Sequence, residues 1–182
     1  MADQALRKPP LGRSHGGSAS ARVTPAAPAT RLSLRAGADA VGTLSLAFGL
    51  ELPQRAKTSA SVGGRHALWL GPDEWLLIDE NGADLMGIAA GVSALHSATD
   101  VSHRNTAIIV SGPNAAEAIA AACPLDLGNT VFPVGAAART VLGKIEIVLL
   151  RTGEEDYRVE CWRSFSSYAF GMLAEGAEDA GL

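Results

Sequence analysis

The sequence predicts an α+β fold in which helices pack on antiparallel or mixed β-sheets. Three observations lead to this prediction. Short apolar runs bounded by turn residues are typical of strands. Other segments place their apolar residues three or four positions apart, as helices do. Along the chain these elements follow the order strand–strand–helix twice and then strand–strand–strand–helix, and such grouping is typical of α+β architecture.

The first predicted elements are a β-hairpin and a helix, and no element is predicted before residue 66. Residues 66–70 and 75–79 are two apolar runs, and the segment Gly71–Glu74 between them contains the Gly-Pro pair of a turn. Apolar residues at helical spacing then predict a helix over residues 82–96, with Asn81 as its candidate N-cap.

The remaining elements are delimited by proline, glycine and serine. Pro113 lies in the first turn of a predicted helix, where its missing N–H costs nothing, and Pro124 lies beyond the end of that helix. Ser164 is the candidate N-cap of the last helix, which ends at Gly176. The predicted strands are residues 99–102, 106–110, 139–142, 145–151 and 157–162, and the predicted helices are residues 115–122 and 165–174.

Residues 1–30 are predicted to form a poorly ordered basic arm, and residues 31–182 a single domain. The arm is rich in Pro, Gly, Ala and Ser and has no apolar period. The first 35 residues contain six basic residues and one acidic residue, whereas the rest contain nine basic and eighteen acidic residues. The arm is either a solvated tail or a segment that orders against an acidic partner. In the second case Arg7, Lys8 and Arg13 are candidate partner contacts.

The composition excludes two classes of partner. A formal net charge of −4 fits nucleic acid poorly, and no run approaches the roughly 20 apolar residues of a membrane span. Only 19% of the residues are charged, against about 25% in ordinary soluble domains. The chain therefore hides surface against a partner, is rich in alanine, or both. Two cysteines without metal-ligand spacing and the lack of a signal-peptide pattern predict a cytoplasmic protein.

No catalytic, cofactor-binding or metal-ligating residue is predicted. The histidines lack metal-ligand spacing, and nucleotide-binding glycine motifs are absent. Ser102 and His103 are neighbours near a predicted strand, so their side chains point to opposite faces and cannot form a nucleophile–base pair. The turn Ser111–Pro113 before a helix offers N–H groups to an anion, although most helix starts bind nothing.

Four acids and three tryptophans each allow two interpretations. One of the acids could serve as a general base if it is buried, but solvated or capping roles are more common. The tryptophans either pack in the core or anchor a partner, since Trp is enriched in binding hot spots. The acids are Asp100, Asp126, Glu146 and Glu160, and the tryptophans, all candidate partner contacts, are Trp69, Trp75 and Trp162.

Six segments together resemble the gamma subunit of heterotetrameric sarcosine oxidase. Their order and spacing hold from about residue 66 to residue 173, and the LGPDEW and CPLDL motifs are specific in combination. The segments are Leu68-Trp-Leu-Gly-Pro-Asp-Glu-Trp-Leu-Leu77, Asp100-Val-Ser-His-Arg-Asn-Thr106, Ser111-Gly-Pro-Asn-Ala115, Ala122-Cys-Pro-Leu-Asp-Leu127, Val148-Leu-Leu-Arg-Thr-Gly-Glu154 and Arg163-Ser-Phe165.

That family is similar to the folate-binding fold of aminomethyltransferases, so the resemblance implies a fold of this kind for residues 31–182. Folate-active members carry a Gly-Gly and an acidic pair before a strand that ends in Arg. The corresponding stretch here is 142–147, leading to Arg151, and only Gly143 remains of the glycine pair. Lys144 and Ile145 stand where acids are expected, so we do not expect folate chemistry in this chain.

The resemblance implies a complex of alpha, beta, gamma and delta subunits. Such a complex oxidatively demethylates sarcosine to glycine and forms hydrogen peroxide with formaldehyde or 5,10-methylenetetrahydrofolate. FAD, FMN, NAD, tetrahydrofolate and zinc are expected in the partner subunits and no cofactor in this chain. The gamma subunit would have no active site and would help to assemble and wall the complex.

Two further readings remain open at this point. The first is a gamma-like subunit of another N-methyl amino acid oxidase or dehydrogenase, for instance one acting on N-methylglutamate, because the substrate is chosen in another subunit. The second is a stand-alone folate-dependent aminomethyltransferase-like protein. A third class, stand-alone regulatory proteins with the folate-binding fold that are involved in iron–sulfur cluster work, is disfavoured. Those proteins carry a reactive Cys in a Lys-Gly-Cys context, and neither Cys123 nor Cys161 has this context.

Overall fold

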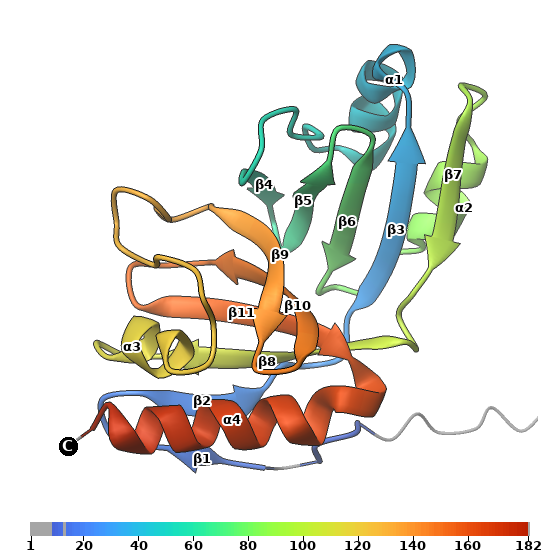
Figure 1. The fold of residues 1–182 in the computed structure, drawn as a ribbon. Coiled ribbons are helices and arrows are strands. Elements are labelled where there is room, and N and C mark those ends of the chain that lie inside the picture. The colour runs from blue at the N-terminus through green and yellow to red at the C-terminus, as the bar shows by residue number, and fades with distance from the viewer. Residues whose placement is uncertain (1–8, 13, 182) are drawn as a thin grey trace, which may run out of the picture.

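The computed structural model describes residues 9–12 and 14–181, which form two antiparallel sheets with helices on their outer faces (Figure 1). None of the helices among these residues is both long and apolar enough to cross a membrane. The larger sheet contains, in spatial order, β1 (Gly16–Gly17), β2 (Arg22–Pro25), β8 (Asn105–Ser111), β11 (Asp156–Trp162), β10 (Ile145–Arg151) and β9 (Ala137–Leu142). The smaller sheet contains β4 (Ser59–Val62), β5 (Arg65–Gly71), β6 (Glu74–Asp79), β3 (Thr30–Ala36) and β7 (His96–Asp100).

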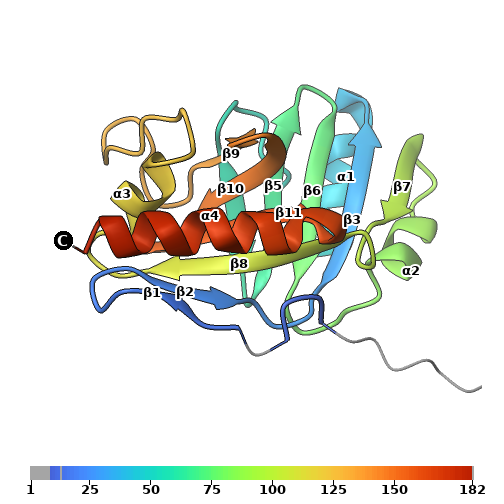
Figure 2. The same ribbon diagram turned by 60° about the horizontal axis from the view of Figure 1, so that its bottom comes forward.

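The helices cover the outer face of each sheet. In the described chain they are α1 (Ala38–Phe48), α2 (Leu85–Ala90), α3 (Ala115–Ala120) and α4 (Ser166–Asp179), and a short 3-10 helix, η1 (Arg163–Phe165), leads into α4. Figure 2 shows α4 lying along the larger sheet beside β1, β2 and β8. Helices α1 and α2 pack on the smaller sheet, and their apolar residues share a core with β3 and β6.

The inner faces of the two sheets pack against each other. On β10, Ile147 and Leu149 face the core under α3 and α4, whereas Val148 and Leu150 face the smaller sheet. Since successive strand residues point to opposite faces, this strand is buried on both sides. β6 repeats the pattern from the other sheet, with Leu77 toward α1 and α2. The molecule is therefore built in four layers, helix, sheet, sheet and helix.

The predicted α+β class is confirmed, and most predicted elements are present within a few residues of their expected bounds. The hairpin is formed by β5 and β6, with Trp69 opposite Trp75. The helix predicted over residues 82–96 is shorter, because α2 covers Leu85–Ala90 only. Its N-cap is Asp84, which accepts a hydrogen bond from the Gly87 N–H at 2.9 Å, and not Asn81. From His96 the chain pairs with β3 as strand β7.

The prediction of a poorly ordered arm is wrong for residues 16–25. β2 pairs with β8 in a register that places Val23 opposite Val110. Ala21 and Val23 are fully buried in the core beneath α4, so burial of their apolar surface holds this segment on the sheet. Gly17 turns with a φ of +85°, and a side chain there would lie 2.1 Å from the carbonyl oxygen of Ala21. The basic residues Arg7, Lys8 and Arg13 lie outside the described residues.

Candidate subunit interface

Three partly exposed aromatic side chains gather where β11 passes into α4. Trp162 ends β11, Phe165 ends η1 and Tyr168 lies in the first turn of α4. Each has between 38% and 39% of its surface exposed, and the spacing of three places them on one face of the chain. The rings of Trp162 and Phe165 are stacked, with centroids 5.8 Å apart and planes inclined by 18°. We call Trp162, Phe165 and Tyr168 the aromatic patch.

Arg104 extends the aromatic patch on the side of β8. Its guanidinium carbon lies 4.2 Å from the centre of the Trp162 ring, a cation–π contact worth about 0.5–1 kcal/mol at an exposed site. The carbonyl oxygen of Arg104 also accepts a hydrogen bond from the Arg163 N–H at 2.7 Å. These two contacts hold the turn before β8 against the start of η1, so the positive charge stays beside the rings.

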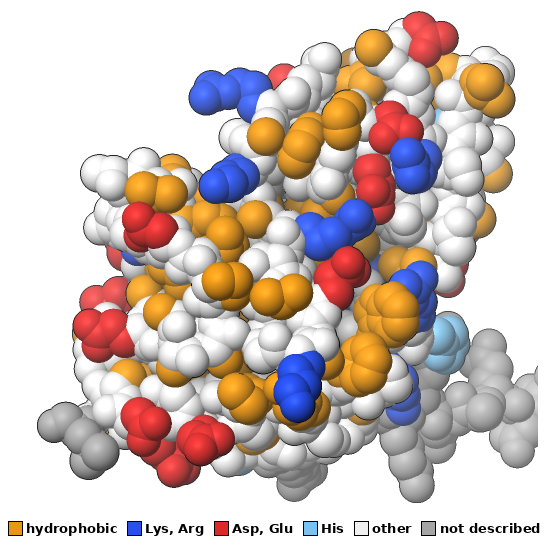
Figure 3. All heavy atoms as spheres, viewed as in Figure 1, with side chains coloured by type: hydrophobic (Ala, Val, Ile, Leu, Met, Phe, Trp, Pro, Cys, Tyr) orange, Lys and Arg blue, Asp and Glu red, His pale blue; other side chains and the backbone are white. Residues whose placement is uncertain are grey.

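Tyr168 links the aromatic patch to the β9–β10 turn. Its hydroxyl oxygen accepts a hydrogen bond from the Lys144 N–H at 3.3 Å. Gly143 has a φ of +57°, and a Cβ atom there would lie 2.4 Å from the same hydroxyl oxygen. Glycine is therefore required at this position both by its backbone conformation and by the contact with Tyr168. Figure 3 shows hydrophobic side chains gathered on this face, over the β9–β10 region and the start of α4.

A buried ion cluster joins the two sheets behind this surface. Glu160 on β11 accepts hydrogen bonds from Arg31 on β3, at 2.6 Å from Nε and 3.1 Å from Nη2. It also accepts one from Arg158 Nε at 2.8 Å, while Arg158 Nη1 donates to Glu80 at 2.7 Å. The side chains of Arg31, Arg158 and Glu160 are 1–3% exposed. Each buried charge has an ion-pair partner, and the Arg31–Glu160 pair links β3 of the smaller sheet to β11 of the larger one.

Titratable groups border the ion cluster on the β5–β6 side. His66 lies 3.9 Å from Glu80, and burial lowers the pKa of its imidazole while the Glu80 carboxylate acts in the opposite direction. Burial also acts to raise the pKa of Asp79, but hydrogen bonds from the Ala83 N–H and from Arg65 outweigh it and lower that pKa. Both shifts are explained by packing and ion pairing and need no catalytic role.

The three tryptophans predicted to contact a partner differ in their exposure. Trp162 is partly exposed in the aromatic patch and Trp69 is half-buried on β5. Trp75 is 1% exposed and donates a hydrogen bond from its indole N–H to the carbonyl of Pro53 at 2.7 Å. The prediction that Trp75 contacts a partner is therefore corrected: its side chain belongs to the core of the smaller sheet.

Sequence reasoning did not single out Phe165, Tyr168 or Arg104 as contacts. The signal available for the two aromatic residues is their spacing of three from Trp162, which predicts a shared face once the helix start is known. Arg104 offers no such signal, because its place over the indole ring depends on the pairing of β8 with β11.

The four acids considered as general bases lie in different environments. Glu160 is buried in the ion cluster, and Glu146 is exposed on β10. Asp100 accepts a hydrogen bond from the Ser102 N–H at 2.8 Å, and Asp126 accepts one from the Gly128 N–H at 2.9 Å, as side chains do in turns.

The nucleophile and metal chemistry of the described residues is limited. Burial raises the pKa of the Cys161 thiol to about 12, so the thiolate required of a nucleophile is not formed at neutral pH. Cys123 is also buried. No group of three or more His, Cys, Asp or Glu able to hold a metal ion occurs within residues 9–12 and 14–181.

Arg151 and Lys144, which the sequence analysis compared with a folate-binding stretch, contact other parts of this chain. Arg151 at the end of β10 is 4% exposed, and its guanidinium donates to the backbone carbonyls of Phe132 at 2.9 Å and Gly153 at 3.2 Å, and to that of Glu154. Its hydrogen bonds therefore hold the loops around the β10–β11 turn. Lys144, in place of an acid, lies in the β9–β10 turn against Tyr168.

Comparison with known proteins places these features in one family. The profile of the "Sarcosine oxidase, gamma subunit family" matches residues 35–179. The gamma subunit of sarcosine oxidase from Corynebacterium sp. strain P-1 is 34% identical over 156 residues, which are 83% of this chain and 77% of the relative.

Two solved structures share the fold. A chain of the heterotetrameric sarcosine oxidase from Corynebacterium sp. U-96, solved with pyrrole 2-carboxylate, superposes with a TM-score of 0.88 at 29% identity and covers 97% of both chains. The glycine cleavage aminomethyltransferase T of Bartonella henselae matches with a TM-score of 0.63 at 16% identity, over 90% of this chain and 49% of that protein. The second likeness shows the fold alone and confirms the predicted folate-binding-domain architecture.

Proposed function

Because the chain belongs to the sarcosine oxidase gamma subunit family, we propose that it is the gamma subunit of a heterotetrameric sarcosine oxidase, an oxidoreductase complex. The observation that carries the proposal is the agreement with a chain of such a complex over nearly the whole length of both molecules. Its partners would be the larger alpha and beta subunits and the small delta subunit.

Within this complex the chain has a structural role and no active site of its own. The chemistry of its interior supports this role, because the buried Arg31, Arg158 and Glu160 bind one another and the Cys161 thiol is held protonated. The exposed aromatic patch supports an assembly role, since aromatic side chains and Arg are enriched at protein interfaces. The chain would contribute contact area and help to wall the complex.

The reaction would take place in the partner subunits, in the cytoplasm. They would bind FAD, FMN, NAD, tetrahydrofolate and zinc, oxidatively demethylate sarcosine to glycine, and form hydrogen peroxide with formaldehyde or 5,10-methylenetetrahydrofolate. Two buried cysteines without a disulfide fit a reducing compartment.

An omission experiment tests the structural role. The alpha, beta and delta subunits are co-expressed with and without this chain. The two products are compared for mass, flavin content and oxygen uptake with sarcosine. The proposal expects partners that retain their flavins but fail to form the complete complex when this chain is missing. A complete, stable complex formed without it would refute an assembly role. Oxygen uptake with N-methylglutamate in place of sarcosine would assign the complex to the other N-methyl amino acid.

A further inference from the structure

An open groove borders the aromatic patch at the start of α4. Its volume is about 500 Å³, and it is lined by Pro10, Arg104, Trp162, Arg163, Ser164, Ser166 and Ser167. We call it the arginine–serine groove. Trp162 belongs both to this groove and to the aromatic patch, and the guanidinium of Arg104, which also lines the groove, lies over the indole ring. The two features therefore form one continuous surface.

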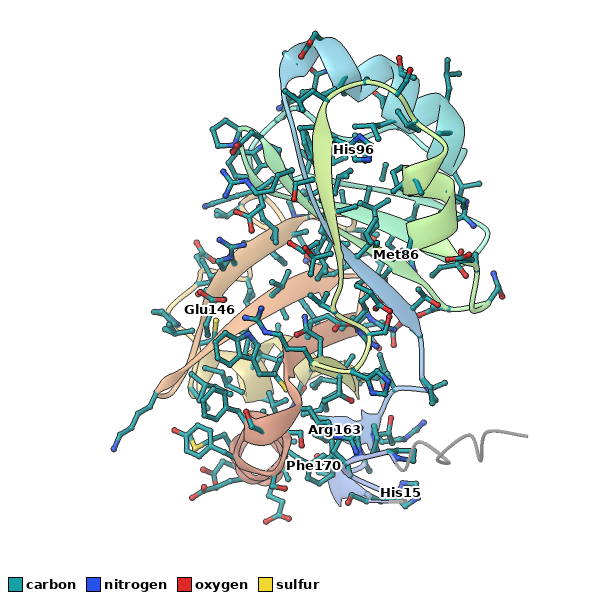
Figure 4. The ribbon with its side chains drawn as sticks, turned by 90° about the vertical axis from the view of Figure 1, so that its right-hand side faces the viewer. His15, Met86, His96, Glu146, Arg163 and Phe170 are labelled. Carbon is teal, nitrogen blue, oxygen red and sulfur yellow. The ribbon has the colours of Figure 1, made fainter. Side chains whose placement is uncertain are left out.

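The charge of this surface is opposite to that of the chain as a whole. The described residues that line the groove include two arginines and no carboxylate, whereas the chain has a net charge of −4. The carboxylates of Glu160 and Glu74 line a separate cavity between the sheets, where Glu160 pairs with Arg31 and Arg158 and Glu74 pairs with Arg139. Figure 4 places Arg163 at the start of α4 and Glu146, which also lines that cavity, away from it on β10.

We propose that the arginine–serine groove and the aromatic patch together bind an acidic segment of a larger partner subunit. This proposal rests on the proposed function and names the surface through which the chain would assemble. Carboxylates of the segment would bind Arg104 and Arg163 and accept hydrogen bonds from the hydroxyls of the exposed Ser164 and Ser167. The buried Ser166 already donates its hydroxyl to the Arg163 carbonyl at 2.8 Å. Apolar side chains of the segment would cover Trp162 and Phe165, which supply rigid contact area at low cost in conformational entropy.

The charge of the surface favours this occupant over a second copy of the chain. In a two-fold dimer the same patch faces itself, so arginines of one copy would lie close to arginines of the other. Like charges at an interface are unfavourable. An acidic segment meets the same arginines with opposite charge and speeds the encounter of the subunits.

The first test is site-specific photo-crosslinking in the co-expressed complex. A benzophenone amino acid replaces Phe165 in the aromatic patch and, as a control, Leu95, which is 88% exposed in the segment before β7. We expect the probe at position 165 to join a stretch of a larger subunit that contains Asp or Glu residues, and the probe at position 95 to give no such product. Mass spectrometry of the joined peptides identifies the segment.

The second test is charge reversal measured by binding. Arg104→Glu with Arg163→Glu should weaken binding of the chain to its partners by about tenfold or more at moderate salt. Arg55→Glu, which reverses an exposed arginine outside the lining of the groove, should leave binding unchanged. The neutral pair Arg104→Gln and Arg163→Gln should weaken binding less than the charge reversal does, and it supplies the test if the reversed variant fails to fold.

The outcomes that contradict this proposal can be distinguished from the outcome that refutes the proposed function. A photo-product with a non-acidic segment, with a second copy, or with nothing at position 165 would overturn the proposal while the complex still forms. Unchanged binding of the charge-reversed variant would do the same. Failure of the wild-type chain to join any partner would instead refute the proposed function.

Discussion

Replacing Glu160 with Gln tests whether the buried ion cluster holds the two sheets together. In the wild-type chain the carboxylate accepts three hydrogen bonds at 2.6–3.1 Å from Arg31 and Arg158. Both arginine side chains are 3% exposed, so water cannot replace the lost negative charge. The amide keeps the volume of the carboxylate but leaves two buried cations beside a neutral group.

The expected loss follows from this geometry. Removing one partner of a buried ion pair costs about 3–5 kcal/mol of unfolding free energy. For a chain of this size about 2–4 °C of Tm corresponds to each kcal/mol, so Glu160→Gln should lower Tm by about 6–20 °C. Urea and thermal unfolding of the purified chain, followed by circular dichroism, measure both quantities.

A matched control and a compensated variant sharpen the test. Glu154→Gln changes a carboxylate that is 81% exposed, so its effect should stay within about 0.5 kcal/mol. Replacing Arg31 and Arg158 with Met and Glu160 with Leu in one variant removes all three charges and should recover most of the loss. If Glu160→Gln destabilises the chain no more than Glu154→Gln does, the ion cluster does not hold the sheets together and this reasoning is wrong.

Three further predictions concern packing, pH and thiol chemistry. Gly176→Ala should lower the unfolding free energy by about 1–3 kcal/mol, because the added Cβ would lie 2.4 Å from a backbone oxygen of α3. Gly171→Ala on the same helix, with open space around it, should raise the unfolding free energy by up to about 1 kcal/mol. Equal effects of the two variants in denaturant titration would contradict this contact. Because the pKa of Asp79 is lowered in the folded chain, the wild-type chain should be more stable than Asp79→Asn above pH about 4. This difference in unfolding free energy should shrink as the pH falls through the lowered pKa. A difference that stays constant from pH 7 to pH 2 would argue against the lowered pKa. At pH 8 an aromatic disulfide reagent should label neither Cys161 nor Cys123 in the native chain, since both are buried and the pKa of Cys161 is raised to about 12. In urea the reagent should label both cysteines. Fast labelling without urea would contradict this prediction and show that the interior opens.

The sequence predicts the elements from about residue 66 onward well because local signals are strong there. The hairpin of β5 and β6 has its turn residues in place, and β10 is mostly apolar and is joined to β11 by a polar turn. Strand β3 is missed because Arg31 and Ser33 interrupt its apolar residues. Only the position of Glu160 opposite Arg31 explains why a charged residue is tolerated inside the sheet packing.

The candidate interface is predicted only in part, because tertiary placement decides which side chains remain exposed. Trp162 can be recognised as an interface candidate from its residue type, but Trp75 has the same type and lies in the core. The difference is set by tertiary placement, since Trp75 points into the core of the smaller sheet and Trp162 ends the last strand of the larger one. The contribution of Arg104 arises from the pairing of strands that are far apart in the sequence.

Native mass spectrometry of the complex purified through a tag on this chain tests the central claim most directly. The account predicts one assembly that contains this chain and three different partner subunits, carries flavin absorbance and consumes oxygen with sarcosine. Recovery of this chain alone, or only as copies of itself without flavin, would contradict the claim that it is a subunit of a sarcosine oxidase.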